Sequence, residues 1–222
     1  MGLGRDILRV FGWYSRGALP DAEVPEPRPT RILKPVEPGP DPSPVLDPIT
    51  PHTSLATETD VAMMRRALEL AREASAVGEV PVGAVVYETA TGRVLAEASN
   101  RRELDRDPTA HAELMAMREA CRVRRDWRLS DCTVVVTLEP CPMCAGVIVN
   151  ARVGRLVYGA ADPKAGACRT LMSLTNDARL NHRVVPVDGV LADECAALLK
   201  SFFASLRRPD RPRKPDSSAP GV

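Results

Sequence analysis

Two short segments of the chain gather residue types that bind metal ions. Residues 108–113 (PTAHAE) contain His111, and residues 139–144 (EPCPMC) contain Cys141 and Cys144. One imidazole and two thiolates suit tetrahedral zinc, with the fourth position open to water. Structural zinc sites usually have four protein ligands, and the sequence offers no good fourth one. These residue types favour a catalytic centre with one Zn²⁺ per subunit over a structural zinc site or reduced cysteines of the core.

Glu113 is the candidate for the proton transfer that such a centre needs. Zinc lowers the pKa of bound water towards neutrality and supplies a hydroxide. A carboxylate that lies near the metal without binding it can accept a proton and pass it on. Glu113 stands two positions after His111. His-x-Glu combined with Pro-Cys-x-x-Cys is the signature of zinc-dependent nucleobase deaminases, so the pattern predicts catalytic deamination.

The spacing of these residues also predicts the elements that position them. Residues two apart inside a helix point about 200° away from each other. His111 and Glu113 can therefore share a site only at the start of a helix, and Pro108 just upstream fits such a start. Cys141 and Cys144 follow an apolar run and are three positions apart, as at a strand-to-helix junction. Both can face one ion from the first helical turn, where the helix dipole favours thiolates.

Hydrophobic periodicity supplies the surrounding elements. Helices are expected near 61–71, 110–124, 143–151 and 192–206. Strands are expected at 80–87, 93–99, 132–138, 155–158 and 183–187, with a turn at 89–92 that makes the first two a hairpin. Strands interleaved with helices after an initial hairpin indicate an α/β sheet with helices on both sides.

Proline divides the chain into three parts. Eleven of the 21 prolines lie between Pro20 and Pro51, which predicts a disordered, extended N-terminal segment over residues 1–59. Residues 60–206 are expected to form one folded domain, a comfortable size for a single core. Residues 207–222 hold further prolines and basic residues, and they are expected to form a disordered basic tail.

Composition narrows the class of protein. The net charge of +1 over 222 residues excludes a globally basic nucleic-acid coat. No apolar run approaches the roughly 20 residues that cross a bilayer, so no membrane is expected as a partner. Charged residues interrupt the first 19 positions, unlike a secretory signal. We therefore expect a cytoplasmic protein in which the four cysteines outside the metal motif are reduced thiols: Cys121, Cys132, Cys168 and Cys195.

Beyond the zinc motif, the chain resembles the bacterial tRNA-specific adenosine deaminase family. The resemblance rests on seven segments spread over the expected domain: 79–84 (EVPVGA), 100–101 (NR), 107–113 (DPTAHAE), 137–146 (TLEPCPMCAG), 158–164 (YGAADPK), 181–184 (NHRV) and 191–199 (LADECAALL). It implies a three-layer α/β/α cytidine deaminase-like fold with a central mixed five-stranded sheet. It also implies zinc-dependent hydrolysis of adenosine to inosine at the wobble position of a tRNA anticodon stem-loop, by a homodimer, with no DNA partner.

The same resemblance implies roles for individual residues. An activated water attacks C6 of the flipped-out base, while Glu113 protonates N1 and then assists the departure of ammonia. Asn100 hydrogen-bonds the base and Val82 lines its pocket. The backbone N–H groups of Ala112 and Cys141 are candidate partners of the tetrahedral centre. Three further residues are expected at the RNA: Asp162, Lys164 and Phe203.

Several other interpretations stay open from sequence alone. The same zinc centre serves a deaminase of a free base or nucleoside, such as guanine, cytosine or cytidine. A non-catalytic RNA-binding subunit could keep a structural zinc, although Glu113 and the open fourth position count against it. Asn100 fits a turn and Val82 a core position. Structural roles are also open for the remaining polar candidates: Asp162, Lys164, Asn181 and His182.

Overall fold

The computed structural model of the protein describes residues 56–207. The extension expected over 1–59, apart from its last four residues, and the tail from 208 onward lie outside the described residues. Within the described part, every helix is too short or too polar to cross a membrane. The first described helix, α1 (Glu58–Ala76), begins two positions before the expected domain start, with Thr57 as its N-cap.

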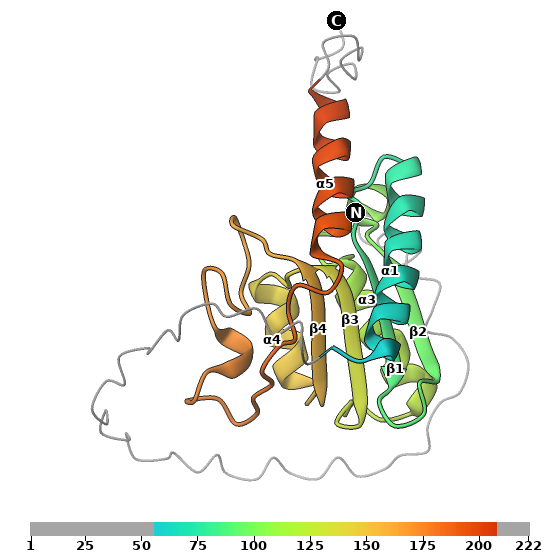
Figure 1. Ribbon diagram of the computed structural model, residues 1–222. Helices are drawn as coiled ribbons and strands as arrows, with labels where there is room; N and C mark the ends of the chain where they lie inside the picture. The colour runs from blue at the N-terminus through green and yellow to red at the C-terminus, as the bar shows by residue number, and fades with distance from the viewer. Residues whose placement is uncertain (1–55, 208–222) are drawn as a thin grey trace, which may run out of the picture. The chain divides into compact units, whose positions relative to one another are not determined.

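Four strands form a mixed sheet in residues 56–207. Their spatial order is β2 (Val94–Ser99), β1 (Gly83–Glu88), β3 (Cys132–Leu138) and β4 (Arg155–Ala160) (Figure 1). β1 pairs antiparallel with both β2 and β3, whereas β3 and β4 pair in parallel. The predicted hairpin and the mixed character of the sheet are confirmed.

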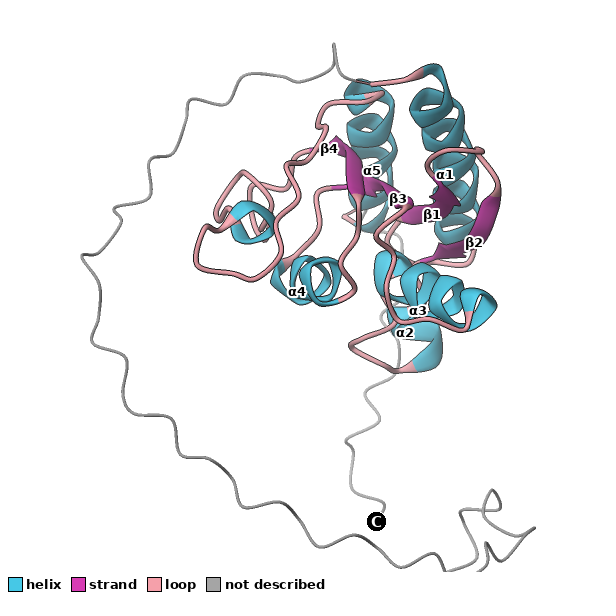
Figure 2. Cartoon of the chain, turned by 90° about the horizontal axis from the view of Figure 1, so that it is seen from below, coloured by secondary structure: helices cyan, strands magenta, loops and turns pink. Residues whose placement is uncertain are grey.

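Helices cover both faces of the sheet, as Figure 2 shows. α1 and α5 (Ala192–Leu206) lie on one face, and α3 (Ala112–Arg124) and α4 (Pro142–Asn150) lie on the other. Two short elements were not expected from the sequence: α2 (Arg102–Asp105) and the 3₁₀ helix η3 (Leu174–Asn176). The predicted three-layer α/β/α fold is therefore confirmed.

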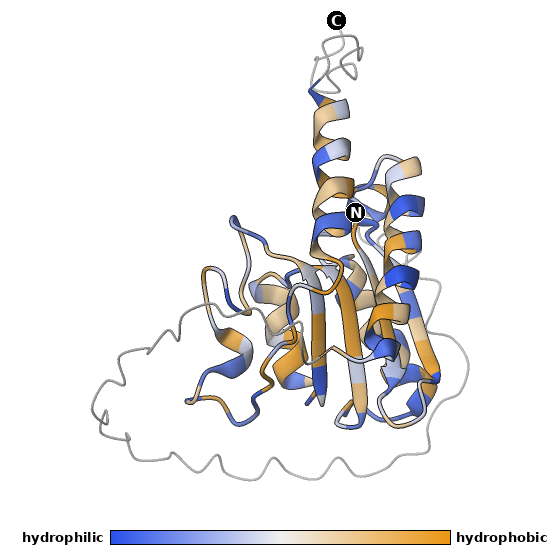
Figure 3. Ribbon diagram, viewed as in Figure 1, coloured by the Kyte–Doolittle hydropathy of each residue, from blue (hydrophilic) through white to orange (hydrophobic). Residues whose placement is uncertain are grey.

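The central strand β3 is apolar at successive positions because both of its faces are buried. Val134 and Val136 belong to the core cluster beneath α3 and α4, whereas Val135 belongs to the cluster that includes Met64 of α1. Neighbouring residues of a strand point to opposite faces, so a strand covered on both sides is apolar throughout. Figure 3 shows hydrophobic residues along β3.

Proline limits two of the expected strands. The strand predicted from residue 80 begins at Gly83, because Pro81 has no N–H for a ladder. The expected fifth strand at 183–187 is wrong as an extended ladder: in the described chain it contributes one isolated parallel bridge, between Val187 and Val157. Pro186 directly precedes Val187, and a proline cannot donate to a neighbouring strand.

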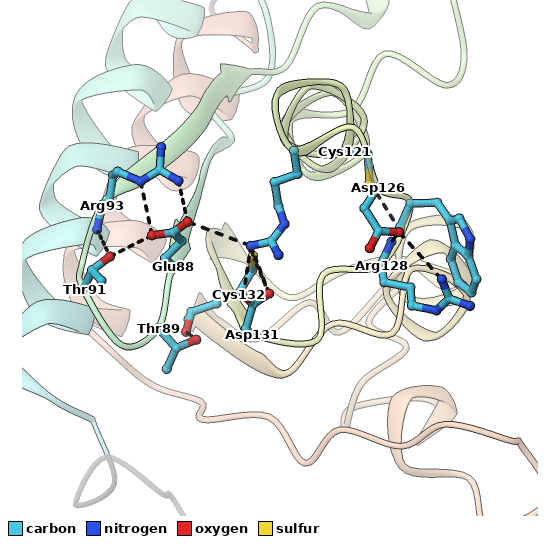
Figure 4. Close-up of polar contacts among 12 residues, drawn as sticks. Glu88, Thr89, Thr91, Arg93, Cys121, Asp126, Arg128, Asp131 and Cys132 are labelled. Carbon is cyan, nitrogen blue, oxygen red and sulfur yellow. Dashed lines mark hydrogen bonds and ion pairs between the residues drawn. The ribbon is translucent and has the colours of Figure 1, made fainter.

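The two ends of β3 lie in different surroundings. The end near Leu138 leads into the motif of residues 139–144. At the opposite end, the carboxylate of Glu88 accepts hydrogen bonds from Arg93 across the hairpin, and Arg124 of α3 lies 3.0 Å from Asp131 (Figure 4). These polar contacts tie α3 and the hairpin to the far end of the sheet, away from the candidate site.

Candidate active site

His111 is the N-cap of α3 and Glu113 lies in the first turn of that helix. The preceding turn sets this start: Asp107 Oδ1 accepts hydrogen bonds from the backbone N–H and the hydroxyl of Thr109, at 2.8 and 2.7 Å. The N–H of His111 then donates to the Thr109 carbonyl at 2.7 Å. His111 has extended backbone angles and the helix follows at once, so the expected helix start between the two residues is confirmed.

The two cysteines lie at the start of α4, directly beyond β3. Cys141 is the N-cap of α4, Pro142 occupies the first turn, and Cys144 is buried one turn further on. Proline suits the first helical position because its missing N–H would have no partner inside the helix there. The Cys141 carbonyl accepts from the N–H of Ala145 at 2.8 Å, which closes that first turn.

These two helix starts bring three candidate ligands together. The Sγ atoms of Cys141 and Cys144 each lie 3.7 Å from Nδ1 of His111, and all three ligand atoms lie within 4.8 Å of one another. With Zn–N near 2.0 Å and Zn–S near 2.3 Å, a tetrahedral centre has an N···S edge of about 3.5 Å. The donor set and its spacing therefore fit a tetrahedral zinc ion with one position left for another ligand.

The electrostatics of the group are those of a thiolate paired with an imidazole. The hydrogen bond from Cys144, aided by His111, lowers the pKa of Cys141 to about 4 against the opposing effect of burial. The hydrogen bond to Cys141 raises the pKa of His111. The pKa of Cys144 is raised by its hydrogen bond to Cys141 and by burial. The surroundings of Cys141 thus favour the thiolate form, which is the form that binds a metal ion.

Glu113 is almost fully buried beside this group, with 4% of its surface exposed. Burial raises the pKa of its carboxyl group, which favours the protonated acid. The charge of His111 opposes this rise, whereas that of Cys141 adds to it. A carboxyl group of this kind, close to a metal site without binding the metal, is suited to accept a proton and pass it on.

The candidate base-binding residues lie next to one another and beside His111. The backbone N–H of Asn100 donates to the Val82 carbonyl at 2.9 Å, and that of Arg101 donates to the Ala110 carbonyl at 3.0 Å. Asn100 and Val82 are 7% and 8% exposed, and Ala112 in the first turn of α3 is fully buried. The structure therefore places Asn100, Val82 and Ala112 around the start of α3.

Glu79 was missed as a site residue by the sequence reasoning. Its fully buried carboxylate accepts a hydrogen bond from Nδ2 of Asn100 at 2.9 Å and from the N–H of Leu104 at 2.6 Å. In the sequence, the one indication of a role for Glu79 was that it belongs to the EVPVGA segment, residues 79–84.

A second buried carboxylate, Glu139, organises the loop that follows β4. It accepts backbone hydrogen bonds from Cys168, Arg169 and Thr170, at 3.1, 2.7 and 2.9 Å, and one from Asp162 at 3.1 Å. The Thr170 hydroxyl donates to the same carboxylate. Glu139 lies two positions before Cys141. Its side chain therefore fixes this loop beside the metal group, as we call His111, Cys141 and Cys144 together. Sequence reasoning missed this role too.

The residues expected at the RNA are more scattered. Asp162 Oδ1 accepts from the N–H of Lys164 at 2.9 Å, so the Asp162 side chain stabilises its own turn. Phe203 is 41% exposed and packs edge-on against the buried Phe202 in α5. Because α5 lies on the opposite face of the sheet from α3 and α4, the structure does not bring Phe203 to the metal group (Figure 2).

Asn181 and His182 make structural contacts. A ring nitrogen of His182, Nε2, lies 2.8 Å from the Val153 carbonyl, and Asn181 Oδ1 accepts from Arg152 at 2.6 Å. Both side chains therefore fasten the segment near residue 182 to the turn that precedes β4.

Comparisons with known proteins place the chain among deaminases. A model of the MafB19-like deaminase family matches residues 58–207. The tRNA-specific adenosine deaminase of Bacillus subtilis (strain 168) is 46% identical over 149 residues, which cover 67% of this chain and 91% of that protein.

Solved structures extend the likeness. A structure from a study of A-to-I editing by tRNA:A34 deaminases superimposes with a TM-score of 0.59 at 40% identity, covering 62% of this chain and 99% of the other. A guanine deaminase from Nitrosomonas europaea gives a TM-score of 0.57 at 28% identity, covering 68% and 86%. The chain carries a MafB19-like deaminase domain and belongs to the tRNA-specific adenosine deaminase family.

Proposed function

We propose that this chain is a zinc-dependent hydrolase that converts adenosine to inosine at the wobble position of a tRNA anticodon stem-loop. One observation carries the proposal: His111, Cys141 and Cys144 converge with the edge length of a tetrahedral zinc site, and the buried Glu113 lies in the same helical turn as His111. The identity to a tRNA-specific adenosine deaminase supports the choice of substrate.

In this proposal three side chains hold the metal and a fourth moves protons. His111, Cys141 and Cys144 bind Zn²⁺. When bound, the zinc ion lowers the pKa of a water molecule and so supplies the nucleophile at neutral pH. Glu113 takes the water proton, delivers it to N1 of adenine as C6 is attacked, and carries the second proton to the departing amine. One water is consumed and one ammonia is released for each inosine formed.

The burial of Glu113 supports this role. A carboxyl group in water is ionised at neutral pH, whereas burial raises the pKa of Glu113 and so favours the protonated form that an acid catalyst needs. Asn100 and Val82 form the wall of the base pocket beside His111. In this proposal the backbone N–H groups of Ala112 and Cys141, each at a helix start, are hydrogen-bond partners of the tetrahedral centre that forms at C6.

The same proposal extends to the rest of the chain. The deaminase domain works as a homodimer and corresponds to the folded unit of the chain. Lys164 and the exposed ring of Phe203 meet the RNA, whereas Asp162 acts by shaping the turn that carries Lys164. Binding to one anticodon loop needs a local charged surface, which a chain of net charge +1 can supply.

A second candidate function is deamination of guanine, favoured by the likeness to the guanine deaminase of Nitrosomonas europaea.

One experiment tests both candidate functions. The zinc-loaded full chain should be incubated with an anticodon stem-loop that carries adenosine at the wobble position. Free adenosine, guanine and cytidine run in parallel, with a stem-loop carrying guanosine at the wobble position as the matched control. Inosine from the adenosine stem-loop alone is the expected result. Xanthine from guanine, with an unchanged stem-loop, would overturn the tRNA proposal.

A further inference from the structure

Glu79 and Asn100 form a buried pair beside the metal group. Glu79 is fully buried and Asn100 is 7% exposed. Oε2 of Glu79 accepts from Nδ2 of Asn100 at 2.9 Å, while Oε1 accepts from the backbone N–H of Leu104 at 2.6 Å. Both carboxylate oxygens therefore have a donor, and the Leu104 N–H belongs to the backbone of α2.

This pair decides the orientation of the Asn100 amide. A carboxylate only accepts hydrogen bonds, so Nδ2 rather than Oδ1 must face Glu79. Oδ1 then lies on the other side of the amide. The backbone cannot turn to reverse this arrangement, because the N–H of Asn100 is bonded to Val82 and the N–H of Arg101 to Ala110.

We propose that Glu79 is a positioning residue that fixes Oδ1 of Asn100 as the acceptor offered to the substrate. The inference rests on the proposed function, because that function assigns Asn100 to the base. Glu79 does not touch the substrate itself. It determines which pattern of donor and acceptor the pocket presents, and with it which nucleobase can pair with Asn100.

The substitution Glu79→Gln reverses that pattern without changing the size of the side chain. The Leu104 N–H still requires an acceptor, so the oxygen of the introduced glutamine stays at the Oε1 position. Its amide nitrogen then faces Asn100, where two donors would oppose each other. Asn100 must turn its amide over, which places Nδ2 where Oδ1 was. A buried donor in place of an acceptor leaves the substrate contact unpaired.

The substitution Asn100→Asp tests the pair from the other side. With Glu79 present, two carboxylates face each other and neither can donate, so the pocket is disturbed. In the double variant, the amide nitrogen from Glu79→Gln donates to the carboxylate from Asn100→Asp. The second carboxylate oxygen then occupies the position of Oδ1. The double variant keeps the number of acidic groups of the wild type and restores the acceptor.

The test is a double-mutant cycle on the full, zinc-loaded chain, measured on whichever substrate of the panel above the wild type deaminates. Each single variant should lower kcat/KM by about 10- to 100-fold, and the double variant should return to within about fivefold of the wild type. Zinc content and far-UV circular dichroism should match the wild type for Glu79→Gln. The control is Glu97→Gln, a matched change on β2 in the half-exposed pair of Glu97 with Arg66 of α1, and this variant should keep wild-type kinetics.

The outcomes separate the two proposals. If the wild-type chain deaminates guanine and leaves the stem-loop unchanged, the tRNA assignment is rejected. The double-mutant cycle, measured with guanine, still tests the pairing of Glu79 with Asn100. An unchanged kcat/KM for a folded, zinc-loaded Glu79→Gln variant would overturn the positioning role. Failure of the double variant to recover activity, with zinc bound, would overturn it as well, since a merely structural pair would restore the fold without restoring turnover.

Discussion

Gly166 lies against the carboxylate of Glu139 so closely that a Cβ at residue 166 would overlap both Oε2 and Cδ of that side chain. The same carboxylate gathers four backbone N–H groups from residues 162–170. The N–H of Ala167 also donates to the Pro140 carbonyl at 2.9 Å, directly before Cys141. The absence of a side chain at residue 166 therefore lets the loop close around Glu139 beside the candidate metal ligands.

Gly166→Ala should lower the free energy of unfolding by about 1–3 kcal/mol, because the added methyl group forces the loop away from Glu139. The measurement is urea unfolding at neutral pH. Gly146→Ala is the matched control, since a Cβ on Gly146 meets nothing within 4 Å and the residue is helical. That change should leave the stability equal or raise it by up to about 1 kcal/mol. Equal effects of the two substitutions would contradict the close packing of Gly166.

Asp60 links α1 to the sheet and gives the protein a pH-dependent contribution to stability. It is fully buried, accepts from Arg155 and Tyr87 at 2.8 and 2.7 Å, and forms a capping box with Thr57. Burial alone raises the pKa of Asp60. The hydrogen bonds from Arg155, Thr57 and Tyr87 outweigh burial and leave the pKa below its ordinary value of 3.8.

A carboxyl group with a lowered pKa binds fewer protons in the folded state, so its stabilisation is complete well above pH 3.8. It is lost as the pH falls through the folded-state pKa. Asp60→Asn should therefore lower the free energy of unfolding by about 2–4 kcal/mol at pH 7. The difference from the wild type should shrink below pH 3.8. Glu119→Gln, in an exposed pair with Arg122, should leave the stability close to that of the wild type, because ion pairs in water contribute little. A difference that grows as the pH falls would refute this role of Asp60.

Metal binding should couple to folding through the cysteines of α4. Cys144→Ala removes one of three ligands, so zinc content measured by atomic emission should fall from one per chain to near zero. The melting temperature of the purified protein should also fall, and a strong chelator should lower that of the wild type. Cys121→Ala changes a thiol outside the group and should keep the metal. Full zinc occupancy in Cys144→Ala would exclude that residue as a ligand.

The start of α1 sets where the folded unit can be cut. A chain that begins at residue 56 keeps Thr57 and the capping box, whereas one that begins at residue 60 loses the cap and the first helical residues. Both should fold, and the longer one should be more stable by about 0.5–2 kcal/mol. Thermal and urea unfolding of the two purified chains would measure the difference. If the chain from residue 56 failed to fold, the N-terminal extension would be part of the domain.

Much of this fold was predictable because its signals are local. The apolar run of β3, the hairpin turn and the helix start between His111 and Glu113 each follow from residues adjacent in sequence. The fifth strand failed because its apolar residues suggested a ladder while Pro186 removed a donor.

The site was predictable only where spacing carries the chemistry. His111, Cys141 and Cys144 could be grouped because the two-residue spacing of His111 and Glu113 and the three-residue spacing of the two cysteines each fit the start of a helix. Glu79 and Glu139 could not be placed in this way, since a glutamate in sequence is usually exposed and its hydrogen-bond donors here come from 21 to 31 positions away. Long-range burial of a carboxylate leaves no local pattern.

The measurement that tests the central claim most directly is inosine formation by Glu113→Gln under single-turnover conditions, with zinc content determined on the same sample. The substrate is the anticodon stem-loop with adenosine at the wobble position. Loss of the proton carrier should lower the rate at least about 100-fold while zinc content and melting temperature stay at wild-type values. A zinc-loaded Glu113→Gln protein that forms inosine at the wild-type rate would contradict the role of Glu113 as the proton carrier.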